Sequence, residues 1–140
     1  GVPEIIDGAN NLFEARGREV HLIDKGEAAC LALSRILDDK QIEHVIAVDE
    51  RTTRMLGEKP ANLKKLLQKK LKTTVEADKS RFKDFQGFRF IRSAELMFIA
   101  YKMGIIKLKG EQVLDALLYA VKFKGCSISD KEIAEIKKLA

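Results

Sequence analysis

The sequence predicts an α/β fold, with a central parallel sheet in a three-layer α/β/α arrangement. Segments with strand character alternate with segments of helical periodicity, which is the order that βαβ units produce. The clearest strand runs from His44 to Val48, and its last four residues are all apolar. A strand without alternating polar residues is typical of a parallel sheet that helices cover on both faces.

The first third of the chain predicts a weak helix, a strand and a strong helix. Residues 3–16 have a weak helical periodicity, and residues 19–23 predict a short strand. Asp24 is expected to be the N-cap of the next helix, because Glu27 stands three residues later and completes a capping box. Ala28, Leu31 and Ile36 then follow at helical spacing.

Apolar residues at helical spacing predict the helices of the remaining chain, and one further apolar run predicts a third strand. These elements are a short helix near 52–56, helices at 61–72, 93–102, 111–124 and 130–139, and a strand at 88–91. Gly104 and Gly125 end two of the helices, since glycine is favoured just past a helix C-terminus. Ser129 is expected to cap the last helix.

Size and composition exclude several classes of protein. The 140 residues predict one domain, 1–140, with a core that needs no disulfide or metal. Hydrophobic residues make up 46% and charged residues 34%, which excludes a disordered, collagen-like or disulfide-rich chain. No apolar run approaches the roughly 18 residues of a membrane span, and no signal peptide is visible. Cys30 and Cys126 lack metal-type spacing and are expected to be reduced thiols of a cytoplasmic protein.

The charge balance permits a nucleic-acid partner. Lys and Arg total 26 against 21 Asp and Glu, and the resulting net charge of +5 permits nucleic acid as a partner without establishing it. The chain has no Trp and 6% aromatic residues, which argues against stacking of single-stranded bases on aromatic platforms. The basic residues concentrate on the helix at 61–72, where four leucines form one face and lysines the other. Those lysines are Lys59, Lys64, Lys65, Lys69, Lys70 and Lys72.

Polar side chains follow three of the predicted strands. Asp24 follows the first, Asp49 and Glu50 follow the second, and Arg92 with Ser93 follows the third. Because ligands of a parallel sheet bind at the carboxyl ends of its strands, we expect these residues to reach the same edge.

In their order and spacing these motifs resemble the second half of a PIN domain. The most similar subgroup is prokaryotic, and its pattern consists of Gly-Glu-x-x-Ala followed by a strand that ends in two acids and an Arg. The matching residues are Gly26-Glu27 with Ala29 nearby, then Val45–Glu50 with Arg51 and Arg54, then Ala100 to Gly104 and Gly125 to Ser129. The resemblance covers residues 23–138, apart from an unmatched insertion at about 57–87.

The resemblance implies a metal-dependent endoribonuclease that hydrolyses RNA phosphodiester bonds with Mg²⁺ or Mn²⁺. Hard cations of this kind take carboxylate oxygens as ligands. Glu27, Asp49 and Glu50 match the catalytic metal ligands, and Asp24 is a possible outer member. Residues expected to contact RNA are Arg51, Arg54, Lys64, Lys65, Lys69, Lys72 and Ser93. Relatives include toxins of toxin–antitoxin pairs and enzymes that process ribosomal RNA, so an antitoxin-type protein and a second copy of the chain are implied partners.

One departure from the family concerns its first acid, which ends the first strand. Nothing ahead of Glu27 is long enough to supply that strand and the helices after it, so we expect the missing part to lie upstream of Gly1. Asp7, after Ile5 and Ile6, is the alternative stand-in.

Other interpretations of the same residues stay open. Asp24 and Glu27 could only cap a helix, Glu50 could pair with Arg54 on a solvated turn, and the lysine face could be plain solvated surface. A catalytically degenerate PIN-like module that binds RNA or protein is the alternative function. A receiver domain fits poorly, because it needs paired N-terminal acids and a late strand-end Lys.

Overall fold

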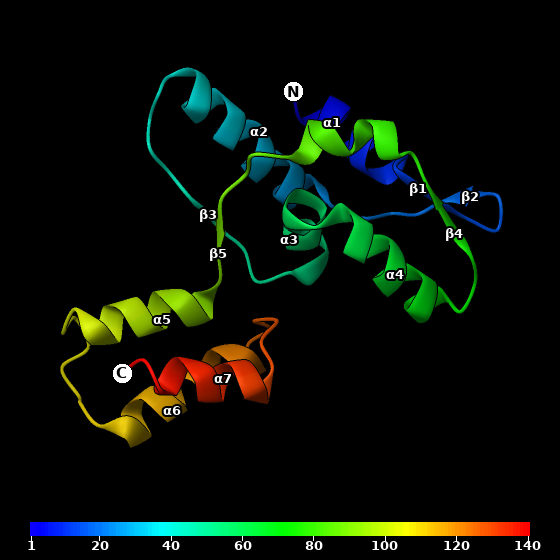
Figure 1. The fold of residues 1–140 in the computed structure, drawn as a ribbon. Helices are drawn as coiled ribbons and strands as arrows, with labels where there is room; N and C mark the ends of the chain where they lie inside the picture. The colour runs from blue at the N-terminus through cyan, green and yellow to red at the C-terminus, as the bar shows by residue number, and fades with distance from the viewer. The chain divides into compact units, whose positions relative to one another are not determined.

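A computed structural model describes residues 1–140 as a mixed α/β structure in which 59% of the residues are helical and the strands are few and short. The chain forms two compact units (Figure 1). The first comprises Gly1–Ile46 with Arg51–Phe90, and the second comprises Ala47–Glu50 with Ile91–Ala140. None of the helices has both the length and the apolar character needed to cross a lipid bilayer.

The first unit combines four helices with a three-stranded antiparallel sheet. In chain order its elements are α1 (Val2–Asn10), β1 (Phe13–Ala15), β2 (Arg18–Glu19), α2 (Lys25–Asp39), α3 (Arg51–Glu58), α4 (Pro60–Leu71), β4 (Val75–Ala77) and the 3-10 helix η1 (Lys79–Phe85). The sheet has the order β2-β1-β4. Buried side chains from each of these elements except β2, together with Leu12, build its core. They are Ile5, Leu12, Phe13, Leu31, Leu56, Leu63, Leu67, Val75 and Phe85.

The hairpin of β1 and β2 differs from the sequence expectation, which continued a helix to Arg16. Helix α1 ends at Asn10, and the chain then turns through Arg16 and Gly17, both with positive φ (54° and 72°). Ala15 pairs with Arg18 across this two-residue turn. A turn with two positive φ angles matches the twist of the flanking strands, and Asn-Gly is its usual sequence. Arg-Gly is a weaker signal, and this explains why the hairpin was not predicted.

The strand expected at 19–23 is wrong beyond Glu19. The side chain of Asn10 takes the place of a neighbouring strand: its Oδ1 accepts hydrogen bonds from the backbone nitrogens of Leu22 (2.7 Å) and Ile23 (3.1 Å). Both of those side chains are buried. A helix-end amide therefore satisfies the backbone that a sheet partner would otherwise pair.

The two other expected strands are confirmed as a short parallel pair. β3 (Ile46–Ala47) pairs with β5 (Phe90–Ile91). The nitrogen of Ile46 donates to the carbonyl of Arg89 (2.8 Å), and that of Val48 donates to the carbonyl of Ile91 (2.9 Å). Partner residues that advance together along both strands define a parallel pair. No larger parallel sheet surrounds it, and the three-layer arrangement is not seen.

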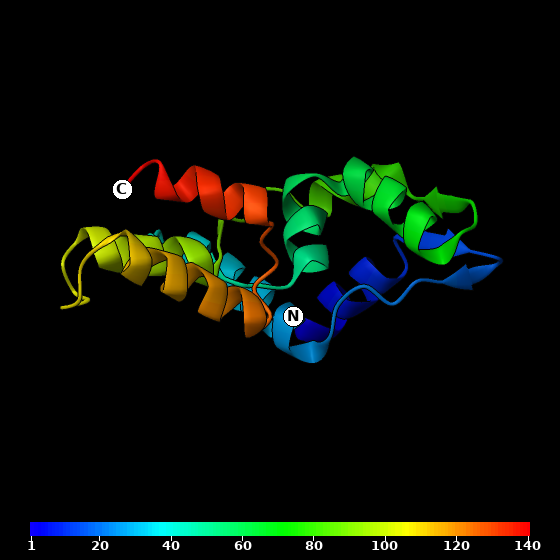
Figure 2. The ribbon, with the colours of Figure 1, turned by 90° about the horizontal axis from the view of Figure 1, so that it is seen from below.

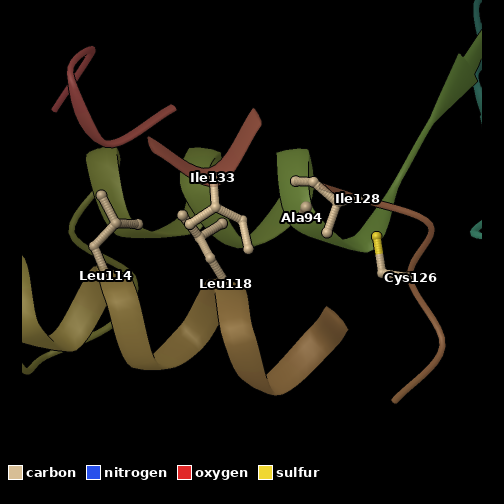
Figure 3. Packing of buried hydrophobic residues seen from close by; sticks show 6 residues of the cluster. All are labelled: Ala94, Leu114, Leu118, Cys126, Ile128 and Ile133. Carbon is tan, nitrogen blue, oxygen red and sulfur yellow. The ribbon is translucent and has the colours of Figure 1, made fainter. Parts of the chain in front are cut away.

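The second unit contains a cluster of three helices that follow β5 in the chain. Its helices are α5 (Ser93–Lys102), α6 (Glu111–Phe123) and α7 (Asp130–Lys137), and they lie side by side (Figure 2). Figure 3 shows the buried residues that they enclose, which are Ala94, Leu114, Leu118, Cys126, Ile128 and Ile133. Ser129 caps α7 as expected, because its Oγ accepts a hydrogen bond from the nitrogen of Glu132 (3.2 Å).

Candidate functional site

The predicted acids fall into two groups, one in each unit. Asp24 and Glu27 lie at the start of α2 in the first unit, whereas Asp49 and Glu50 follow β3 in the second. The structure contains no group of three or more His, Cys, Asp or Glu side chains placed to hold one metal ion. Each group is therefore described from its own surroundings.

The group at the start of α2 has the expected capping geometry. The backbone nitrogen of Asp24 donates to Oε2 of Glu27 (2.9 Å), so these two residues are brought together. Oδ1 of Asp24 lies 2.8 Å from Nε2 of His21, and Nδ1 of His21 lies 3.2 Å from Nδ2 of Asn10. The result is an exposed chain of contacts that links the Asn10 amide, the His21 imidazole and the Asp24 carboxylate.

A cavity of about 480 Å³ opens beside this chain of contacts. Its walls include Ile6, His21, Asp24 and the first residues of α2, Lys25 and Gly26. His21 and Asn10 were not predicted as site residues, because each is isolated in the sequence. Spacing offers one signal that could have identified His21: it stands three residues before the strand-end acid Asp24.

Asp49 is anchored at the start of α5. Its Oδ1 accepts a hydrogen bond from the nitrogen of Ser93 (2.7 Å), and its Oδ2 accepts one from the Ser93 hydroxyl (2.6 Å). Burial raises the pKa of the Cys126 thiol, and a hydrogen bond from that thiol to Asp49 raises it further. The predicted neighbours Asp49 and Ser93 thus meet, whereas Glu50 is exposed.

Arg92, the residue before Ser93, is the centre of a half-buried ionic network. Its guanidinium donates to Glu95 on α5, to Glu132 on α7 (2.9 Å) and to the carbonyl of Ser127 (2.9 Å). These bonds raise the pKa of Arg92, chiefly through Glu95. Burial would raise the pKa of Glu132, but hydrogen bonds from Ser129 and Arg92 outweigh it and lower the pKa to about 2. Arg92 is thereby a structural residue that positions the start of α5.

The lowered pKa of Glu132 predicts a loss of stability in acid. Its ordinary pKa is 4.5, so the stabilising contribution is present above that pH and is lost as the pH falls from about 4.5 toward about 2. We expect Glu132→Gln to be less stable than the wild type at pH 7, and the difference in the free energy of unfolding to shrink at pH 3. Urea unfolding of the wild type and of Glu132→Gln at pH 7 and at pH 3 measures this difference. An equal difference at pH 7 and pH 3 would mean that the Glu132 charge contributes nothing.

The basic helix forms where it was predicted. α4 buries Leu63 and Leu67 against the first unit, while Leu66 is half-buried and Leu71 is 37% exposed. Its lysines are exposed except for Lys64, which is half-buried, and none of them forms an ion pair in the chain. Arg51 is exposed and Arg54 is half-buried on α3. A row of cations without acidic partners is available to a polyanion.

Comparisons with protein-family models, with curated proteins and with solved structures return no match for this chain.

Proposed function

We propose that the chain is a PIN-like domain of the α/β class that hydrolyses RNA phosphodiester bonds with Mg²⁺ or Mn²⁺ in the cytoplasm. The observation that carries this proposal is the position of Asp49. It follows a strand of a parallel pair and lies beside the first residue of the helix after the partner strand, Ser93. Strand ends of this kind are where α/β proteins place their ligands.

The chemistry of the acidic side chains, rather than their placement, supports the proposed ion. Glu27, Asp49 and Glu50 would hold it, with Asp24 as an outer member, and all four supply the oxygen ligands that hard cations take. When bound, such an ion lowers the pKa of a coordinated water and stabilises negative charge on the phosphate. His21 orients the Asp24 carboxylate through a contact of 2.8 Å.

RNA contact is proposed for the unpaired cations on the first unit, Lys64, Lys65, Lys69 and Lys72 with Arg51 and Arg54, and for Ser93 at the start of α5. Contacts of this type position the phosphate backbone without selecting a sequence. The resemblance adds an antitoxin-type protein and a second copy of the chain as proposed partners.

A second candidate is a PIN-like module that binds RNA or protein without cutting it. The specific observation in its favour is that the Asp49 carboxylate already accepts hydrogen bonds from the nitrogen and hydroxyl of Ser93 and from the Cys126 thiol. A carboxylate that fastens a helix start contributes to folding with or without a metal ion.

Titration with Mn²⁺ separates the two candidates without measuring activity. For the nuclease we expect saturable Mn²⁺ binding by calorimetry, weakened at least about tenfold in Glu27→Gln and in Asp49→Asn, since each change removes one anionic ligand. Asp39→Asn, an exposed acid near the end of α2, is the charge-matched control and should bind Mn²⁺ like the wild type. Equal affinity in all four proteins, or no binding at all, would favour the non-cutting module.

A further inference from the structure

A second recess of the first unit lies beside the predicted acid group at Asp24 and has a different lining. A cavity of about 620 Å³ lies between the β1–β2 hairpin and the end of α4. Arg16, Arg18 and His21 line it on the hairpin side, and Leu71 and Thr73 line it on the α4 side. Its volume is in the range of pockets that hold small organic ligands, roughly 300–1,000 Å³.

Two arginines of the hairpin give the recess its charge. Arg16 and Arg18 are both exposed, and neither side chain forms a hydrogen bond or an ion pair within the chain. One carboxylate, Glu19, also belongs to the lining, so the net charge of the lining side chains is positive. Guanidinium groups bind phosphate through paired hydrogen bonds, which favours an anionic ligand here.

The backbone at Arg16 is held in a conformation that arginine disfavours. Its φ is +54°, the left-handed region, where Asn or Gly would be less strained at this turn position. Residues held in such sparsely populated backbone conformations cluster at ligand-contacting sites, which makes Arg16 a candidate contact residue.

The opposite wall is apolar and continues into the basic helix. Leu71 is 37% exposed and Thr73 is half-buried, so the recess has an apolar surface with a hydroxyl beside it. Lys69, Lys70 and Lys72 are exposed next to Leu71 in the sequence. On its other side the recess shares His21 with the cavity at Asp24. The recess and the acid group at Asp24 therefore adjoin one another at His21.

We propose that this recess seats one nucleotide of a single-stranded RNA, with its phosphate on Arg16 and Arg18 and its base against Leu71. The strand continues along the lysines of α4 in one direction and toward Asp24 in the other. A nucleotide combines the two chemistries that the recess offers, an anionic group and a flat apolar ring. The identification of the ligand as RNA rests on the proposed function, whereas the recess and its arginines do not.

Binding measured without catalysis tests this inference. The probe is a labelled oligouridine of about ten nucleotides, within the usual site sizes for single strands, in EDTA, read by fluorescence anisotropy at several salt concentrations. Arg16→Gln with Arg18→Gln should weaken binding at least about tenfold, because charge-assisted bonds to phosphate are lost. The salt dependence should flatten by about 0.7 in log–log slope for each phosphate released. Lys107→Gln with Lys109→Gln, the same charge change on exposed lysines of the second unit, should stay within about twofold of the wild type.

Two further measurements keep the inference separate from folding and from the nuclease. Arg16→Asn should melt at or above the wild-type temperature, because Asn tolerates positive φ, and should still bind RNA more weakly. Asp39→Asn, an exposed acid outside both the recess and the proposed metal site, should bind the oligonucleotide like the wild type in EDTA, so that a failure of the nuclease proposal leaves this result standing. Unchanged RNA affinity in the double arginine variant would overturn the inference. It would also be overturned if a glutamate-rich peptide of equal charge bound as tightly as RNA with the same dependence on Arg16 and Arg18.

Discussion

Replacing Arg92 by methionine should lower the free energy of unfolding by about 2–3 kcal/mol, because the change leaves two carboxylates without the cation that they face. The Arg92 side chain is 11% exposed, whereas those of Glu95 and Glu132 are 37% and 43% exposed. The partly exposed partners recover some hydration, so the effect should fall below that of breaking a fully buried ion pair. Methionine retains an unbranched apolar side chain and removes the guanidinium with its charge and donors.

Urea unfolding of Arg92→Met measures this effect. The control is Arg89→Met, which removes an exposed arginine whose ion pair with Glu43 has a 4.0 Å separation. Surface pairs contribute little, so the control should change stability by less than about 1 kcal/mol. If Arg92→Met unfolds at the same urea concentration as Arg89→Met and the wild type, the network around Arg92 does not hold α5 to α7.

Local patterns predicted those parts of the fold whose signals are local. The uniformly apolar run before Asp49 predicted β3, the capping box predicted the start of α2, and four leucines at helical spacing predicted α4, which spans Pro60–Leu71. The β1–β2 hairpin and the hydrogen bonding of the backbone at Leu22 were not predicted, because in both places an unusual residue stands where the usual signal would be. Arg16 occupies a turn position that usually carries Asn, and Asn10 replaces a neighbouring strand from 12 residues away.

In the candidate site, too, a contact that follows from strand order was predicted, whereas contacts that depend on packing between distant residues were not. Strand order predicted that Asp49 and Ser93 would meet, and they do, at 2.6 Å. The role of Arg92 in the ionic network was not predicted, because its partner Glu132 lies 40 residues away on α7. Spacing also gave no signal for the recess between Arg16 and Leu71, since no motif joins a hairpin to the end of a later helix. Contacts between residues far apart in sequence depend on packing, which periodicity does not encode.

Removing one carboxylate from the proposed metal site should abolish RNA cleavage while the protein stays folded. We expect Asp49→Asn and Glu27→Gln each to reduce the rate by about 10²- to 10³-fold, because metal stabilisation of the transition state is worth several kcal/mol and each 1.36 kcal/mol is tenfold in rate. The amide oxygen of asparagine can still accept the bond from the Ser93 nitrogen, and its NH2 group can donate to the Ser93 hydroxyl, so the start of α5 should be retained. Thermal unfolding checks that both variants fold.

Cleavage of a labelled single-stranded RNA in Mg²⁺ or Mn²⁺ is the most direct test of the nuclease proposal. The expected result is cleavage by the wild type and by the control Asp39→Asn, with loss of cleavage in EDTA and in the Asp49→Asn and Glu27→Gln variants. Cleavage that persists in EDTA, equal rates in the wild type and both site variants, or an intact RNA with the wild type would contradict the proposal that this chain is a metal-dependent ribonuclease.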